Sequence, residues 1–212
     1  MIKAILFDMD GTLVDSENYY TSKSFDWLKQ YKKDSNIKDV YKIVGLNMND
    51  TYKMMASLAG ISFDECKTSY DKYFLCHPIN YNDYLFSDVK DTLYKLKDKY
   101  KLCVCTSSDK NMLNSFISDC DLNLFDLTLS SDDVLNSKPN PEVYLKALNR
   151  LNISSDEAIV VEDSYSGIKA GKNANIYTIA RNSDRYLIDQ SDADYIFNDM
   201  HEILEILDEK NN

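Results

Sequence analysis

The strongest constraint on the fold is a set of short apolar runs that end in polar or acidic residues. Five runs indicate buried strands and a sixth is weaker; they cover residues 3–7, 102–106, 127–130, 158–161, 176–180 and 195–197. Runs without alternating polar residues are typical of parallel sheets that helices cover on both faces. Helical patterns separate the runs, over residues 88–100, 110–120, 141–151, 164–174 and 200–207. The alternation predicts an α/β fold with a doubly wound parallel sheet.

Residues 16–81 interrupt this alternation. They contain no convincing strand but four helical patterns, over residues 17–33, 37–44, 49–59 and 62–76. Ser62 and Glu65 have the spacing of a capping box at the start of the fourth pattern. The sequence therefore predicts two domains: an α/β core of residues 1–15 and 82–212, and an inserted four-helix cap domain of residues 16–81.

Composition excludes several classes of function. The chain has 24 Lys and Arg against 35 Asp and Glu, a net charge of −11, which argues against binding to nucleic acid or anionic lipid. No apolar run approaches the roughly 20 residues of a membrane helix, and we expect a cytoplasmic protein. The five cysteines form no Cys-x-x-Cys pair, so neither a disulfide framework nor a zinc site is indicated.

Polar side chains follow four of the predicted strands where each one ends. In chain order they are Asp8, Asp10, Thr106, Ser107, Lys138, Glu162 and Asp163. The carboxyl ends of parallel strands meet at one edge of a sheet, and ligands bind there. We therefore expect these residues to form one site.

The chemistry of these residues indicates a phosphoryl group bound through a metal ion. Four converging carboxylates repel one another, and a divalent cation relieves the repulsion. An all-oxygen ligand set is what Mg²⁺ prefers. Lys138 and the Thr106 hydroxyl suit phosphate, and Gly11 allows the backbone to approach a ligand closely.

The two aspartates after the first strand have separate possible roles. Asp8, directly at the strand end, suits nucleophilic attack on phosphorus, a known use of a carboxylate. Asp10, one step into the loop, suits proton transfer to the leaving oxygen and later from water.

These segments resemble the signatures of the haloacid dehalogenase superfamily. Asp8-Met-Asp-Gly-Thr-Leu-Val-Asp-Ser16 is similar to the first signature and Thr106-Ser-Ser to the hydroxyl motif. Lys138-Pro-x-Pro is similar to the lysine motif, and Glu162-Asp-Ser-x-x-Gly-Ile-x-Ala-Gly171 to the acidic metal motif. The inserted helices resemble the cap of the β-phosphoglucomutase-like subfamily, so the resemblance covers nearly the whole chain.

The resemblance implies a role for each group of residues. Asp8 is the implied nucleophile and Asp10 the implied acid/base, with Mg²⁺ as cofactor. The implied metal ligands are Asp8, Asp10 through its carbonyl, Glu162 and Asp163. The implied phosphate contacts are Met9, Thr106, Ser107 and Lys138. In the cap, residues similarly placed to face the substrate are Tyr20, Gly45, Asn47 and Asn49.

We therefore expect a Mg²⁺-dependent phosphatase that hydrolyses a small phosphomonoester, such as a sugar phosphate, through an aspartyl phosphate. Its partner is a small phosphorylated metabolite, not nucleic acid or a membrane, and we expect a monomer. One alternative is a hexose-phosphate mutase, but the family mutases carry a histidine and an arginine where Tyr20 and Met48 stand here. Another is a non-catalytic phospho-ligand binder, which the complete set of motifs disfavours.

Simpler interpretations exist for single motifs. Asp10-Gly11 alone is compatible with a hairpin turn, and Lys138 before a proline is compatible with a solvated loop. Glu162-Asp-Ser164 could only cap the following helix. We expect Ser108 and Asp109 to cap the helix that follows them and assign them no chemistry.

Overall fold

The computed structural model describes residues 1–44, 46, 48–183 and 188–211. The chain divides into two compact units, each described here by itself. The α/β unit comprises Met1–Asp15 and Tyr81–Asn212, and the helical unit comprises Ser16–Asn80. None of the helices in the described part of the chain combines the length and the hydropathy of a membrane-spanning segment.

The α/β unit is built on a parallel sheet in the order β3-β2-β1-β4-β5-β6. Each neighbouring pair of strands is parallel. The strands are β1 (Ala4–Phe7), β2 (Lys101–Cys105), β3 (Leu127–Leu129), β4 (Ala158–Glu162), β5 (Tyr177–Arg181) and β6 (Tyr195–Phe197). The predicted parallel α/β fold is therefore confirmed, and each expected strand is present to within one residue at either end.

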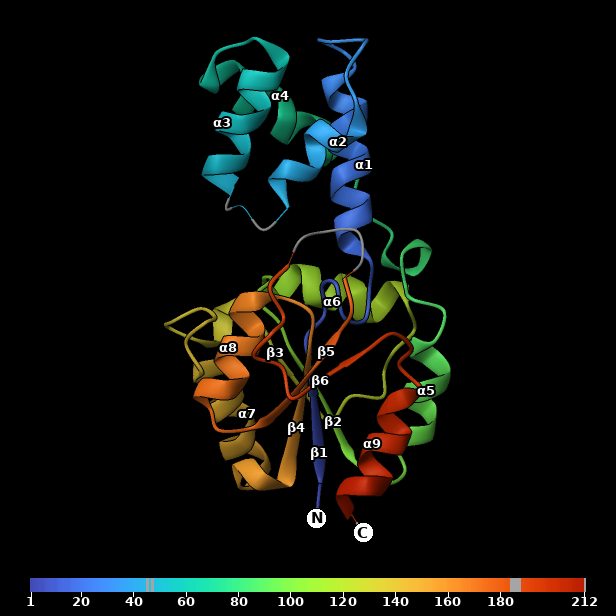
Figure 1. Ribbon diagram of the computed structural model, residues 1–212. Helices are drawn as coiled ribbons and strands as arrows, with labels where there is room; N and C mark the ends of the chain where they lie inside the picture. Colours follow the sequence, from blue (N-terminus) through green and yellow to red (C-terminus); the bar gives the residue numbers. More distant parts are fainter. Residues whose placement is uncertain (45, 47, 184–187, 212) are drawn as a thin grey trace. The chain divides into compact units, whose positions relative to one another are not determined.

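Helices cover both faces of this sheet (Figure 1). They are α5 (Val89–Leu96), α6 (Lys110–Asp119), α7 (Glu142–Leu151), α8 (Tyr165–Asn173) and α9 (Glu202–Asn211), with 3-10 turns at Tyr81–Asp83, Ser131–Asp133 and Ser155–Glu157. Figure 1 shows α7 and α8 on one side of the strands and α5 and α9 on the other. Side chains alternate between the two faces along each strand. Leu6, Cys103 and Val160 lie on the face that packs against α7 and α8, where they form one core cluster with Tyr144 and Ala170. Because both faces are covered, β1 and β4 are fully buried.

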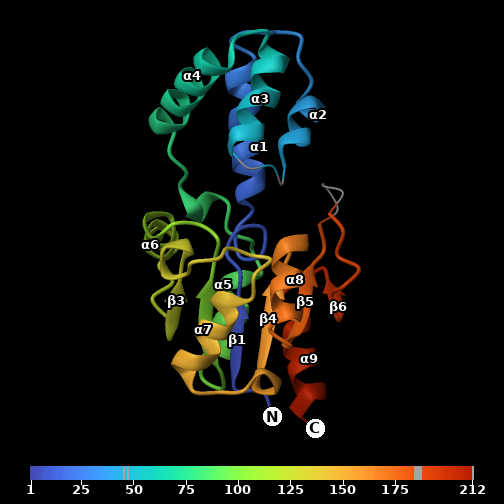
Figure 2. The same ribbon diagram turned by 90° about the vertical axis from the view of Figure 1, so that its left-hand side faces the viewer.

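The helical unit contains α1 (Ser16–Leu28), α2 (Ile37–Val40), the 3-10 turn Tyr41–Ile43, α3 (Met48–Ala59) and α4 (Phe63–Cys76). Its core includes Trp27, Met55 and Tyr70, and Figure 2 shows its helices from a second side. The Ser62 side chain accepts a hydrogen bond from Glu65 N at 3.2 Å, so the predicted cap of α4 is present. Helix α1 ends five residues before the predicted end, because residues 29–34 are exposed and a longer helix would bury nothing.

The strand order brings the ends of β1, β2 and β4 together. β1 pairs with β2 on one side and with β4 on the other. The chain adds β2 and β3 on one side of β1 and then β4, β5 and β6 on the other side. The order of strands therefore changes direction at β1. Such a switch point at the carboxyl edge is where α/β sheets bind ligands.

Candidate active site

The loop after β1 is a tight turn that begins at Asp8. Asp8 N–H donates to Val161 O of β4 at 2.8 Å, which fixes the start of the loop to the sheet. Gly11 has φ +78°, and its N–H donates to Val14 O at 2.8 Å. A Cβ at Gly11 would lie 2.0 Å from Asp163 Oδ2. Glycine is therefore required both by the backbone conformation and by the close approach of the loop after β4.

Lys138 lies at the centre of the acidic groups. Its Nζ donates to Asp8 Oδ1 at 2.6 Å, to Glu162 Oε1 at 2.6 Å and to Cys105 O at 2.9 Å. The lysine side chain is only 4% exposed. The structure thus brings together three predicted residues, from the loops after β1 and β3 and from the last position of β4, and Lys138 is not a solvated loop residue.

Glu162 accepts four hydrogen bonds besides that from Lys138. Tyr144 OH donates to its Oε1 at 2.8 Å, while Asp163 N, Ser164 N and Ser164 Oγ donate to its Oε2 at 3.1, 3.3 and 3.1 Å. A Cβ at Gly167 would lie 1.8 Å from Oε1, so glycine makes room for the carboxylate. Ser164 also caps α8 by accepting from Gly167 N at 3.0 Å; capping and the acidic cluster therefore coexist.

The ionisation of these groups is coupled. Burial raises the pKa of the Asp8 carboxyl; Lys138 opposes the shift, and the Glu162 and Asp10 carboxylates add to it. Burial also disfavours the charge of Glu162, but Lys138 and Tyr144 outweigh it and lower the pKa of Glu162. For Lys138, burial disfavours the ammonium, yet Asp8 and Glu162 hold its pKa well above the ordinary value. A further cation beside Asp8 would favour its charged form.

The arrangement of carboxylates fits a hard divalent cation. Asp8, Glu162 and Asp163 are buried, and each offers an oxygen within 4.8 Å of those of the other two. With Asp10 these are four carboxylates against the single positive charge of Lys138. An all-oxygen set with excess negative charge is the chemistry that Mg²⁺ requires. The donor set therefore fits the predicted cofactor.

The residues after β2 contact the loop after β1 through Ser108. Thr106 is buried, and its Oγ1 accepts from Ser108 N at 3.0 Å. Ser108 Oγ donates to Asp10 Oδ2 at 2.7 Å. The prediction that Ser108 caps the next helix is therefore wrong: Asp109 alone of the pair is the N-cap of α6, accepting from Met112 N at 2.9 Å.

The other predicted phosphate contacts differ in exposure. Ser107 is exposed, whereas the Met9 side chain is fully buried. Met9 could therefore meet a ligand only through its main chain.

The predicted substrate-facing residues lie in the helical unit. The Tyr20 ring packs against Tyr19, with ring centroids 5.0 Å apart, and against Phe74 at 6.0 Å. Asn49 is exposed in the first turn of α3. The predicted positions Gly45 and Asn47 lie outside the residues that the structure describes.

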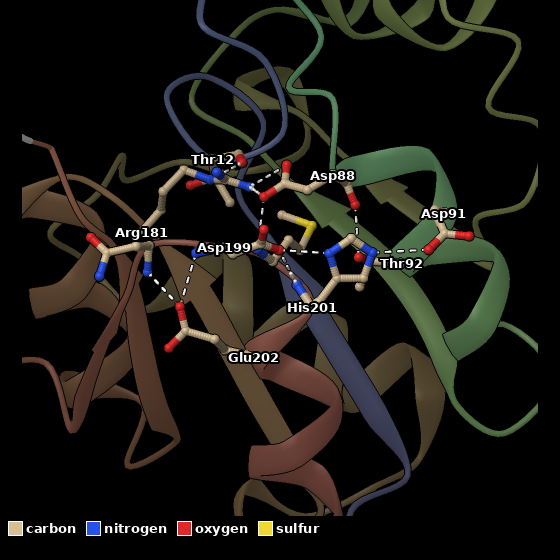
Figure 3. Close-up of polar contacts among 10 residues, drawn as sticks. Thr12, Asp88, Asp91, Thr92, Arg181, Asp199, His201 and Glu202 are labelled. Atoms are coloured by element: carbon tan, nitrogen blue, oxygen red, sulfur yellow. Dashed lines mark hydrogen bonds and ion pairs between the residues drawn. The ribbon is translucent and has the colours of Figure 1, made fainter.

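Further polar side chains bind the main chain of the loops after β1 and β4, and Figure 3 shows those around Arg181. Arg181, at the end of β5, donates from Nε to Thr12 O at 3.0 Å and from one guanidinium NH₂ to both oxygens of Asp88 at 3.0 and 3.1 Å. Gln190 Nε2 donates to Asp163 O at 2.5 Å and to Arg181 O at 2.7 Å. Sequence reasoning missed these residues and Tyr144, because no local motif marks them.

Fold and site together define an enzyme of α/β type with an acidic centre at the carboxyl edge of its sheet. Comparison with known proteins agrees with this class. The family model of haloacid dehalogenase-like hydrolases matches residues 5–181. The chain belongs to this family, as the motifs predicted.

Curated relatives match along the full chain. One is the pyrophosphatase PpaX of Bacillus cereus (strain Q1), which is 28% identical over 219 residues, covering 99% of this chain and 98% of the relative.

Solved structures show the same fold. A "putative beta-phosphoglucomutase from Thermotoga maritima" has a TM-score of 0.82 and 28% identity, covering 98% of this chain and 99% of that one. A "predicted phosphoglycolate phosphatase" of Haemophilus somnus 129PT has a TM-score of 0.79 at 24% identity, covering 97% and 98% of the two chains.

Proposed function

We propose that this hydrolase is a Mg²⁺-dependent phosphatase that acts on a small phosphomonoester through an aspartyl phosphate. The observation that carries the proposal is the meeting of Asp8, Lys138, Glu162 and Asp163 at the carboxyl edge of the sheet. A buried carboxylate beside a buried ammonium provides a nucleophile and a charge that stabilises a transferring phosphoryl group.

In the proposed first step, an Asp8 carboxylate oxygen attacks phosphorus and the bond from phosphorus to the ester oxygen breaks. The leaving oxygen takes a proton from Asp10. In the second step, water loses a proton to Asp10 and attacks the phosphorus of the aspartyl phosphate, which releases inorganic phosphate and restores the Asp8 carboxylate. Thr106, Ser107, Lys138 and the main chain at Met9 bind the phosphoryl oxygens.

The proposed ligands for Mg²⁺ are the side chains of Asp8, Glu162 and Asp163 and the main-chain carbonyl of Asp10. When bound, the ion supplies positive charge that offsets the repulsion between carboxylates and phosphate. Gly11 keeps the space beside Asp163 open, and Gln190 fixes the Asp163 main chain.

One further substrate and one alternative reaction are each supported by the name of a similar protein. The name of the Bacillus relatives favours inorganic pyrophosphate, on which the same two steps would release phosphate as the leaving group. The name of the Thermotoga structure favours the mutase alternative. Against a mutase, Tyr20 packs on aromatic neighbours and Met48 carries no charge, so neither supplies the histidine or arginine of the family mutases.

The test is phosphate release from a panel of sugar phosphates, other phosphorylated metabolites and pyrophosphate, with Mg²⁺ and with EDTA. We expect Mg²⁺-dependent release, which Asp8→Asn abolishes. Activity that survives EDTA or Asp8→Asn would overturn the proposed chemistry. β-Glucose 1-phosphate with a trace of the bisphosphate is included; conversion to glucose 6-phosphate without net phosphate release would establish the mutase instead.

A further inference from the structure

The proposed acid/base residue is held by the last hydroxyl of the Thr106-Ser-Ser segment, to which the resemblance assigns no role. Ser108 Oγ donates to Asp10 Oδ2 at 2.7 Å, across 98 residues of sequence. A serine hydroxyl has one hydrogen to donate, and in this structure that hydrogen is directed at the Asp10 carboxyl.

The position of this hydroxyl is fixed by the backbone around it. Ser108 N–H donates to Thr106 Oγ1 at 3.0 Å, and Ser108 O accepts from Ser131 N at 3.0 Å. The segments after β2 and β3 thus locate the hydroxyl.

We propose that Ser108 is a positioning residue for Asp10: its hydrogen bond to Oδ2 holds the carboxyl in the direction from which it delivers a proton to the leaving oxygen. Proton transfer depends on the direction in which the acid is held. The inference rests on the proposed function, because it gives Ser108 a role only in leaving-group protonation.

The test compares two aryl esters that differ in their need for an acid. Phenyl phosphate has a basic leaving group, whereas the dinitrophenolate of 2,4-dinitrophenyl phosphate leaves without a proton. The quantity measured is kcat/KM for each, which covers the steps up to departure of the leaving group. General acid catalysis contributes about 10²–10⁴-fold to the rate. We expect Ser108→Ala to lower kcat/KM about tenfold for phenyl phosphate and less than about twofold for the dinitrophenyl ester.

Two control variants separate positioning from structure. Ser108→Thr keeps the hydroxyl and should keep the wild-type ratio of the two kcat/KM values. Asp109→Ala removes the neighbouring helix cap and should lower the melting temperature, but it should leave the ratio unchanged. The ratio does not depend on the fraction of folded protein, so partial unfolding of a variant cannot imitate the effect.

Each outcome bears on the proposal. A fall in the ratio for Ser108→Ala, restored in Ser108→Thr, supports it. An unchanged ratio in Ser108→Ala, or an equal fall in Asp109→Ala, overturns it while the phosphatase assignment stands. A wild-type protein that hydrolyses neither ester with Mg²⁺, nor any phosphate in the panel, overturns both.

Discussion

Removing the buried Tyr144 hydroxyl should reveal how much its hydrogen bond to Glu162 contributes to the stability of the fold. Tyr144→Phe deletes the group that donates to Glu162 Oε1 at 2.8 Å, in a side chain that is fully buried. The ring stays, so the contact of Lys138 Nζ with its face, 5.0 Å from the centroid, is kept. The substitution therefore tests the hydrogen bond rather than the packing.

The magnitude follows from the charge of the acceptor. A hydrogen bond to a charged group contributes about 1.5–3 kcal/mol. Lys138 remains on the same Glu162 oxygen at 2.6 Å, so the loss should fall in the lower half of this range. For a chain of this length, 1 kcal/mol corresponds to about 2–4 °C in melting temperature. We expect Tyr144→Phe to melt about 3–9 °C below the wild type.

Urea and thermal unfolding followed by circular dichroism would measure this difference. Tryptophan fluorescence is unsuitable, because the single tryptophan, Trp27, lies in the helical unit rather than in the α/β unit. Tyr94→Phe is the matched control, since Tyr94 is 49% exposed on α5 and its change should stay within about 0.5 kcal/mol. If Tyr144→Phe unfolds at the same midpoint as Tyr94→Phe, the argument that Glu162 needs its donors is refuted.

Two further substitutions test the close approach of the loops and the pH dependence of stability. Gly11→Ala should weaken Mg²⁺ binding and lower kcat/KM together, because its Cβ would lie 2.0 Å from Asp163 Oδ2 at a φ of +78°. Calorimetric titration with Mg²⁺ measures the affinity. A wild-type affinity in Gly11→Ala would contradict the expectation. Hydrogen bonds to Asp91 and Asp199 raise the pKa of His201. The stability that protonated His201 contributes to the fold is therefore complete below about pH 6.5, the pKa of an unperturbed histidine, and is lost as the pH rises through the raised pKa. The melting temperatures of wild type and His201→Ala should therefore converge as the pH rises from below about 6.5 through the raised pKa; a constant difference would show that the charge of His201 plays no part.

Much of the site could be predicted because strand ends are visible in the sequence. Asp8, Thr106 and Glu162 each follow an apolar run, and parallel pairing places the ends of such runs at one edge. The pairing of β1 with both β2 and β4 then brings these positions together. Local pattern and sheet geometry suffice for this part.

The supporting residues could not be predicted, because their partners are distant in sequence. Tyr144 belongs to the buried stripe of α7 with Val143, Ala147 and Leu148, and that pattern indicates packing alone. Ser108 precedes an aspartate at a helix start, a local signature of capping, whereas its partner is Asp10 in another loop. Such contacts depend on the register of several strands and loops at once.

The central claim is that Asp8 becomes phosphorylated during turnover. The direct measurement is rapid acid quenching of wild-type protein with Mg²⁺ and its best substrate, followed by peptide mass spectrometry. We predict one phosphoryl group on the peptide that contains Asp8, formed within a single turnover and absent in Asp8→Asn. Full turnover with no phosphorylated peptide at any quench time, or with the phosphoryl group on another residue, would contradict the account.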